Sequence, residues 1–115
     1  MDLVSVNERK KILKDELRRM VDIIKVKYKP DKVILFGSFA RGKVHKWSDI
    51  DLLIIKDTRQ RPIDRCVRLA RLVHPKVGVD LFIYTPKEYE FLLKEKFSLL
   101  MNILKEGKVL YEKRN

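Results

Sequence analysis

Three aspartates lie on apolar, strand-like segments, where a carboxylate needs a chemical reason to be. Asp49 and Asp51 are two residues apart at the start of the apolar run 50–55. Because side chains alternate along a strand, both carboxylates project to one face and Ile50 to the other. Two neighbouring ionised carboxylates repel each other, and a divalent cation between them relieves that repulsion. Mg²⁺ is the natural candidate, since it prefers hard oxygen ligands and shares them with substrate phosphates.

Asp80 is the third of these carboxylates, and it lies within the otherwise apolar segment 77–83. A lone ionised aspartate inside a buried strand is costly without partners. If this strand lies beside the one that carries Asp51, the three carboxylates form one cluster. Asp49 taken alone is equally well explained by an Asx turn at the end of a loop. That alternative extends poorly to all three aspartates together.

The dipeptide Gly37-Ser38 follows the buried, strand-like run 33–36 and precedes Phe39-Ala40-Arg41-Gly42. A glycine lets the backbone approach a ligand closely, and successive N–H groups at such a turn can bind phosphate. The serine hydroxyl adds one more donor. A Gly-Ser pair by itself indicates only an ordinary turn, so its distance from the aspartates carries the information.

Gly37-Ser38, ten intervening residues and then Asp49-Ile50-Asp51 resemble the signature of the nucleotidyltransferase superfamily that includes DNA polymerase beta. The fuller text, Gly-Ser-Phe-Ala-Arg-Gly ending in Ser-Asp-Ile-Asp-Leu, looks most like its minimal nucleotidyltransferase group. Asp80 occupies the place of that family's third carboxylate. The closing segment 106–111 is also similar to the tail of these small proteins, so the resemblance covers nearly the whole chain.

The resemblance implies a role for each of these residues. Asp49 and Asp51 would bridge two Mg²⁺ ions, Asp80 would complete one metal site, and Gly37 and Ser38 would hold the triphosphate. One metal would lower the pKa of an attacking hydroxyl, while the other would neutralise the pyrophosphate leaving group. Asp80 could also receive the hydroxyl proton, although metal assistance makes a dedicated base unnecessary.

The reaction implied is transfer of a nucleoside monophosphate, with ATP as the expected donor, to a hydroxyl group. The 115 residues leave no room for the extra domains with which polymerases bind their substrates, so we expect another protein to present or be the acceptor. Minimal nucleotidyltransferases are commonly antitoxin partners of HEPN-domain toxins. The resemblance therefore implies AMP transfer to a tyrosine of such a toxin, a ribonuclease, which silences it.

Charge supports a rival hypothesis, a binding module without turnover. The 27 Lys and Arg residues against 16 Asp and Glu residues give a formal net charge of +11. Such a surface attracts polyanions, including an acidic partner protein or nucleic acid. Direct nucleic-acid binding is possible but not favoured, since clustered carboxylates repel a phosphate backbone unless metal is bound.

Composition places the chain among globular proteins. With 45% hydrophobic and 37% charged residues, residues 1–115 are expected to form one domain. The only cysteine, Cys66, excludes an internal disulfide and a Cys-based zinc site, and is interpreted as a small buried apolar residue. We expect a cytoplasmic protein without a membrane partner, since no apolar run approaches about 18 residues and no signal-peptide pattern begins the chain.

The elements that must position these residues alternate in type. The first helix begins with a capping box, Ser5 and Glu8, and ends at Pro30. Further predicted elements are strands over 33–36, 50–55 and 77–84, helices over 62–74, 86 to about 96 and 98–106, and a short edge strand over 109–111. This order predicts an α/β (α+β) fold in which helices pack against a small mixed sheet. The resemblance implies that this is the nucleotidyltransferase fold.

Other polar and aromatic residues leave alternatives open. Arg41 could contact the triphosphate or the acceptor, or be a surface arginine. Trp47 could stack on a base, but packing under its loop is the preferred interpretation. His45 and His74 are interpreted as structural or surface residues. One basic stripe on the second helix could dock an acidic partner, although a solvated face is the simpler interpretation; it comprises Arg61, Arg65, Arg68 and Arg71.

Overall fold

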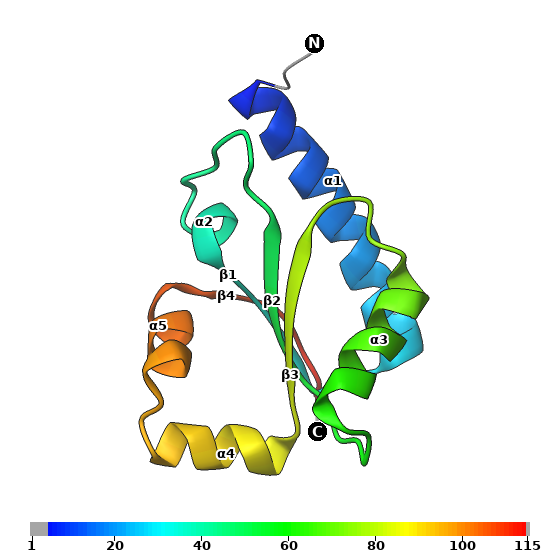
Figure 1. The fold of residues 1–115 in the computed structure, drawn as a ribbon, viewed down its shortest axis with the longest axis vertical. Helices are drawn as coiled ribbons and strands as arrows, with labels where there is room; N and C mark the ends of the chain where they lie inside the picture. The colour runs from blue at the N-terminus through cyan, green and yellow to red at the C-terminus, as the bar shows by residue number, and fades with distance from the viewer. Residues whose placement is uncertain (1–4, 115) are drawn as a thin grey trace.

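The computed structural model describes residues 5–114. Its elements include all those predicted from the sequence, in the predicted order, together with a π-helical turn and a short helix after the first strand (Figure 1). They are α1 (Val6–Ile23), the π-helical turn η1 (Ile24–Tyr28), β1 (Lys32–Phe36), α2 (Gly37–Ala40), β2 (Ile50–Ile55), α3 (Pro62–Val73), β3 (Val79–Tyr84), α4 (Pro86–Lys94), α5 (Ser98–Glu106) and β4 (Lys108–Glu112).

The four strands form one mixed sheet in the order β3-β2-β1-β4. Strand β1 runs antiparallel to both of its neighbours, β2 and β4, whereas β2 and β3 are parallel. Helix α3 makes the crossover that a parallel pair requires. The mixed sheet predicted from the sequence is thereby confirmed, with the expected last strand at its edge.

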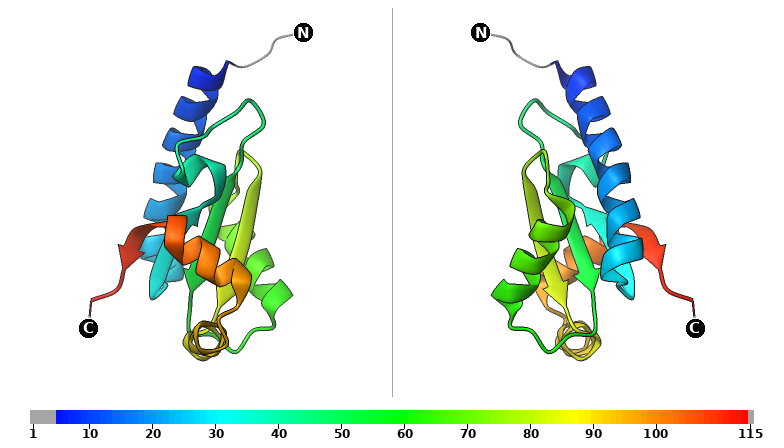
Figure 2. Two further views of the ribbon diagram at one scale, coloured as in Figure 1. Left: turned by 90° about the vertical axis from the view of Figure 1, so that its left-hand side faces the viewer. Right: turned by 90° about the vertical axis from the view of Figure 1, so that its right-hand side faces the viewer.

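Helices cover both faces of this sheet. Figure 2 shows α1 and α3 on one face and α4 and α5 on the other. The first face holds the larger core, to which α1 contributes Leu13 and Met20 and β2 contributes Leu52. The second core is smaller and joins Leu53 of β2 to Leu100 of α5. Alternation along β2 therefore sends consecutive leucines into different cores.

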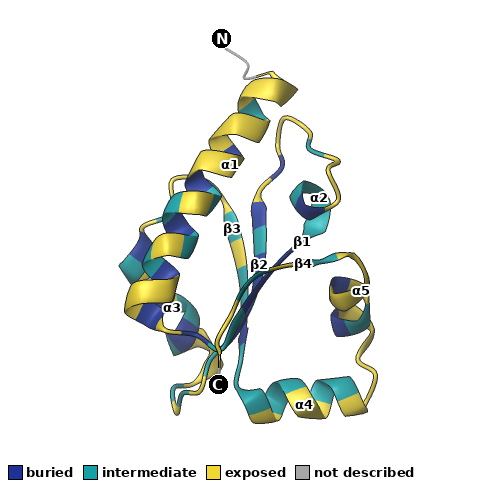
Figure 3. Ribbon diagram, turned by 180° about the vertical axis from the view of Figure 1, so that it is seen from behind, coloured by how far each residue is buried: buried dark blue, intermediate teal, exposed yellow. Residues whose placement is uncertain are grey.

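Burial follows this layering, as Figure 3 shows along α1, where buried residues recur at helical spacing between exposed ones. The central strand β2 is buried along almost its whole length. One large aromatic side chain departs from this pattern, because Phe91 on α4 is 60% exposed. Its neighbours Leu92 and Leu93 fill the second core instead.

Capping explains where two helices begin. The Ser5 side chain accepts a hydrogen bond from the backbone N–H of Glu8 at the start of α1, which is one half of the predicted capping box. At the start of α4, Thr85 and Glu88 form both halves. The predicted boundaries differ slightly elsewhere: β3 begins at Val79 rather than at 77, and α4 ends at Lys94.

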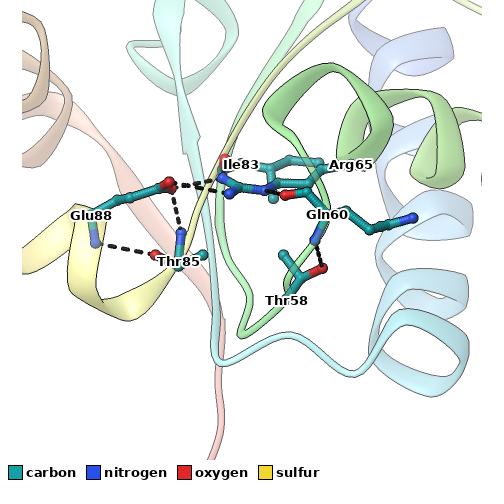
Figure 4. Close-up of polar contacts among 6 residues, drawn as sticks. All are labelled: Thr58, Gln60, Arg65, Ile83, Thr85 and Glu88. Carbon is teal, nitrogen blue, oxygen red and sulfur yellow. Dashed lines mark hydrogen bonds and ion pairs between the residues drawn. The ribbon is translucent and has the colours of Figure 1, made fainter.

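The predicted arginine stripe on α3 is not a uniform solvated or docking face. Arg65 is only 5% exposed, and its guanidinium donates two hydrogen bonds to the Glu88 carboxylate, at 2.7 and 3.1 Å, and one to the Ile83 carbonyl (Figure 4). Arg68 lies over the Tyr28 ring. Arg65 is thus a structural tie between α3 and α4, because a buried guanidinium needs a paired carboxylate.

No helix within residues 5–114 is both long and apolar enough to cross a membrane.

Candidate active site

The predicted site residues gather at one end of the sheet, the upper end in Figure 1. Strand β1 ends there at Phe36 and passes directly into α2, whose first residues are Gly37 and Ser38. Strands β2 and β3 both begin at this end. The topology therefore brings the Gly-Ser turn and all three aspartates to one edge, although 29 positions of sequence separate Asp51 from Asp80.

Asp51 and Asp80 are paired in register across the parallel strands β2 and β3. Their side chains lie on the face of α4 and α5, beside the stacked rings of Phe36 and Phe82. Burial raises the pKa of Asp51 to about 6, and a hydrogen bond and the like charge of Asp80 add to that shift. Such an unfavourable pair of carboxylates is what a bound cation would stabilise.

Gly37 supports Asp51 from the neighbouring strand. Its φ of +81° lies in the left-handed region that favours glycine, and a Cβ at this position would lie 2.9 Å from the Asp51 Cγ. Only a residue without a side chain therefore lets the turn after β1 approach the carboxylate so closely. The Gly-Ser turn and Asp51 are therefore in direct contact, although 14 positions of sequence separate Gly37 from Asp51.

Asp49 lies just before β2 and is held from two sides. Its Oδ1 accepts a hydrogen bond from Arg9 Nη2 at 3.2 Å, an ion pair between α1 and the site. On its other side is Gly78, where a Cβ would lie 2.7 Å from the Asp49 Cγ. Ile50, between the two aspartates, is fully buried in the opposite core, as the alternation predicts.

Ser38 of the turn is connected to the aspartate strand by a buried serine. The hydroxyl groups of Ser38 and Ser48 are hydrogen-bonded at 3.0 Å, and Ser48 is only 2% exposed. Ser48 Oγ also accepts from the His45 backbone N–H at 2.9 Å. The loop between the two halves of the motif is therefore anchored at its end, next to Asp49.

Arg41 and Trp47 also belong to this loop, and the structure places them in different surroundings. Arg41 forms an ion pair with Glu106 at the end of α5, at 3.3 Å, and both side chains are partly exposed. It lies near enough to Asp51 to act against the rise in that carboxyl's pKa. Trp47 is 75% exposed, so the prediction that it packs under its loop is wrong. An exposed indole beside Ser48 is available to a ligand or partner instead.

The donor set of the site fits Mg²⁺, because it consists of carboxylates, and the crowded pair Asp51 and Asp80 carries negative charge that a cation would neutralise. Within residues 5–114, no three His, Cys, Asp or Glu side chains stand arranged as a metal site. The Asp49 carboxylate is engaged by Arg9. Asp49, Asp51 and Asp80 are the residues that would hold the metal.

Three residues of the site were not predicted from the sequence: Arg9, Ser48 and Gly78. Arg9 is one of several basic residues on the first helix, and nothing in its neighbourhood distinguishes it from the others. Ser48 is part of the Ser-Asp-Ile-Asp text, and its position next to Asp49 was the available signal. Neither Arg9 nor Gly78 is marked by spacing, since their contacts with Asp49 span 40 and 29 positions.

A solved structure shares the arrangement of helices around this sheet. The crystal structure of a Sulfolobus solfataricus protein, provisionally described as a nucleotidyltransferase, aligns over 94% of this chain and 87% of its own, with a TM-score of 0.65 and 19% identity. A second structure, described as a toxin-antitoxin with AMP-PNP, aligns over 91% of this chain and 74% of its own, with a TM-score of 0.51 and 25% identity. The first likeness establishes the nucleotidyltransferase fold.

The sequence comparisons establish the family. Residues 18–115 match the family model described as polymerase beta, nucleotidyltransferase. The Methanocaldococcus jannaschii protein MJ0604, provisionally named a protein adenylyltransferase, is 39% identical over 98 residues, which cover 83% of this chain and 94% of that protein. The chain belongs to the polymerase beta nucleotidyltransferase family, as one of its minimal members, and is an enzyme of that type.

Proposed function

We propose that this protein is a protein adenylyltransferase that transfers AMP from ATP to a tyrosine hydroxyl of a partner HEPN-domain toxin and so acts as its antitoxin. The observation that carries the nucleotidyl-transfer chemistry is the register pair Asp51 and Asp80 beside the Gly37 turn. In the reaction, the acceptor oxygen bonds to the α-phosphorus of ATP as the bond from that phosphorus to the β-phosphate oxygen breaks. Pyrophosphate leaves, and the hydroxyl proton passes to a base or to water.

The chain's own residues divide the work. The N–H groups of the turn at Gly37 and Ser38 bind and orient the triphosphate, and the Ser38 hydroxyl is kept in place by Ser48. Asp49, Asp51 and Asp80 would hold two Mg²⁺ ions. When bound, these ions supply activation of the hydroxyl and charge neutralisation at the leaving group. Arg41, at the exit of the turn, is proposed to contact the nucleotide or the acceptor by exchanging its Glu106 partner.

Protein as the acceptor class is supported by relatives rather than by the site alone, because a site defines a reaction more closely than a substrate. MJ0604 and a second Methanocaldococcus jannaschii protein, MJ1305, are both provisionally named protein adenylyltransferases. MJ1305 is 32% identical over 91% of this chain and 76% of its own length. The solved structure described as a toxin-antitoxin with AMP-PNP supports both a nucleotide substrate and a partner toxin for this protein. A HEPN toxin and a tyrosine acceptor come from the family resemblance.

The test is the intact mass of the partner. The protein is incubated with ATP, Mg²⁺ and the product of its neighbouring gene, which we expect to be a HEPN-domain protein, and the mass of that partner is followed with time. We expect stepwise additions of AMP, which peptide mapping then places on tyrosine. The double variant Asp49→Asn/Asp51→Asn should give none.

Asp57→Asn is the matched control, because this exposed carboxylate lies just beyond the other end of β2. It should retain the transfer reaction. A stable complex without any mass addition, with ATP or with the other three nucleotides, would exclude the proposed transfer and favour neutralisation by binding alone. Additions on a residue other than tyrosine would support the proposed AMP transfer but would show that tyrosine is not the acceptor.

A further inference from the structure

Helix α1 reaches into the active site through Arg9. The Arg9 Nε donates a hydrogen bond to the Ser48 carbonyl at 2.9 Å, and its Nη2 donates to Asp49 Oδ1 at 3.2 Å. The Arg9 side chain is 19% exposed, far less than a solvated arginine. This residue lies ahead of the segment 18–115 that matches the family model, so the contact adds an element that the family match does not cover.

We propose that Arg9 is a positioning residue for the nucleotide site, and this inference rests on the proposed function. By binding Oδ1, Arg9 fixes the rotamer of Asp49 and leaves the second carboxylate oxygen for the cation that accompanies the nucleotide. The fork of the guanidinium reaches two adjacent groups, a backbone carbonyl and a carboxylate, which a lysine ammonium cannot do in the same geometry.

Ser48 extends the effect of Arg9 to the phosphate side of the site. The Ser48 carbonyl accepts from Arg9, while its hydroxyl is bonded to the Ser38 hydroxyl at 3.0 Å. Because Ser48 is almost fully buried, these bonds are sheltered from competing water. A shift of Ser48 would therefore move the metal-binding Asp49 and the phosphate-binding Ser38 together. Arg9 sets the distance between them.

Charge acts in the opposite direction, since a guanidinium repels a cation bound at the same carboxylate. The Asp49 side chain is 49% exposed, so water screens this repulsion strongly. Hydrogen-bonded support of a ligating carboxylate is typically worth about 10–100-fold in metal affinity. Loss of Arg9 is therefore expected to weaken Mg²⁺ binding rather than strengthen it, and the sign of the effect separates the two roles.

The readout is the fluorescence of Trp47, the chain's single tryptophan, which is exposed and precedes Ser48. Mg²⁺ is titrated into the protein with a saturating non-hydrolysable ATP analogue, and calorimetry provides a second measure of binding. For Arg9→Ala we expect the Mg²⁺ concentration at half-saturation to rise about tenfold or more. Arg9→Lys should recover part of this loss. Lys10→Ala removes an exposed positive charge from the same helix and should match the wild type.

The inference is overturned if Arg9→Ala needs no more Mg²⁺ than Lys10→Ala, or needs less. Thermal unfolding of each variant checks the fold. If Arg9→Ala does not fold, Arg9→Lys is tested instead: a several-fold rise in the Mg²⁺ concentration at half-saturation supports the inference, and no rise overturns it. Failure of the proposed function looks different. In that case the wild type itself gives no Mg²⁺-dependent nucleotide binding by either method and behaves like Asp49→Asn, which overturns both.

Discussion

Asp51 and Asp80 are register partners across the parallel strands β2 and β3, and the like charge of Asp80 helps to raise the pKa of Asp51. Without a cation, two carboxyl groups at this spacing disfavour the folded state, because the unfolded chain separates them. The carboxylate pair to which we assign the metal therefore costs the folded protein stability.

Removing one of the two charges should stabilise the metal-free protein. We expect Asp80→Asn to raise the free energy of unfolding at pH 7 by about 1 kcal/mol, the equivalent of roughly one pKa unit of relieved repulsion, while abolishing AMP transfer. Urea unfolding in the presence of a chelator measures the first effect. Asp57→Asn, an exposed carboxylate away from the pair, should leave stability unchanged. A loss of stability in Asp80→Asn would mean that the pair is favourable as it stands.

Gly78→Ala should separate activity from stability. A Cβ at this position would lie 2.7 Å from the Asp49 carboxylate, so the side chain of Asp49 must move, whereas the backbone of Gly78 does not lie at positive φ. A displacement of about 1 Å can cost on the order of 100-fold in rate. We expect that loss in the transfer assay, with a melting temperature close to that of the wild type.

Gly42→Ala is the complementary control for this variant. Gly42 has a φ of +71° but open space around it, so alanine should cost about 1 kcal/mol of stability and leave the transfer rate near that of the wild type. If both alanine variants lost activity equally, the cause would be the loop as a whole and not the contact with Asp49.

Glu16 should make stability depend on pH in the acid range. Glu16 is 5% exposed and accepts hydrogen bonds from Arg19, at 2.7 and 2.8 Å, and from the Lys76 backbone N–H at 2.6 Å. The Arg19 hydrogen bond is the main cause that lowers the pKa of Glu16 below its ordinary 4.5. Its contribution is therefore fully present above about pH 4.5 and is lost as the pH falls through the folded-state pKa.

For Glu16→Gln we expect a loss of about 2 kcal/mol at pH 7, a difference from the wild type that shrinks below pH 4.5. Chemical unfolding at pH 7 and pH 3.5 measures it. Asp15→Asn is the neighbouring control, because the ion pair of Asp15 with Lys11 is exposed and contributes at most about 0.5 kcal/mol. A pH-independent difference would show that the ionised form of Glu16 is not the stabilising one.

Arg65 should behave as a core residue despite its charge. Removing the buried guanidinium in Arg65→Ala leaves the Ile83 carbonyl and the Glu88 carboxylate without their partner, and we expect a loss of about 3 kcal/mol. Arg71→Ala, an exposed member of the same predicted stripe, should stay within about 0.5 kcal/mol of the wild type. Thermal and urea unfolding measure both. If Arg65→Ala lost no more stability than Arg71→Ala, within about 0.5 kcal/mol of the wild type, the solvated-face interpretation would hold for Arg65 as well.

The sequence by itself determined the elements and the reaction class. Period-two alternation predicted that Ile50 turns into the core on the side opposite Asp51, as the structure has it. Apolar runs and capping residues located the strands and helices, with errors of one or two residues at their ends. These features are local, since they depend on neighbours within a few positions along the chain.

Only the tertiary structure decided which distant residues support that chemistry. Register in the parallel pair β2 and β3 placed Asp80 opposite Asp51. Packing of α1 against the loop brought Arg9 into hydrogen bonds with Ser48 and Asp49, and the approach of α4 buried Arg65. Trp47, which was predicted to pack under its loop, lies exposed instead. Arginine and tryptophan each have an apolar body and a polar end, so their environment is set by what packs against them and not by their spacing.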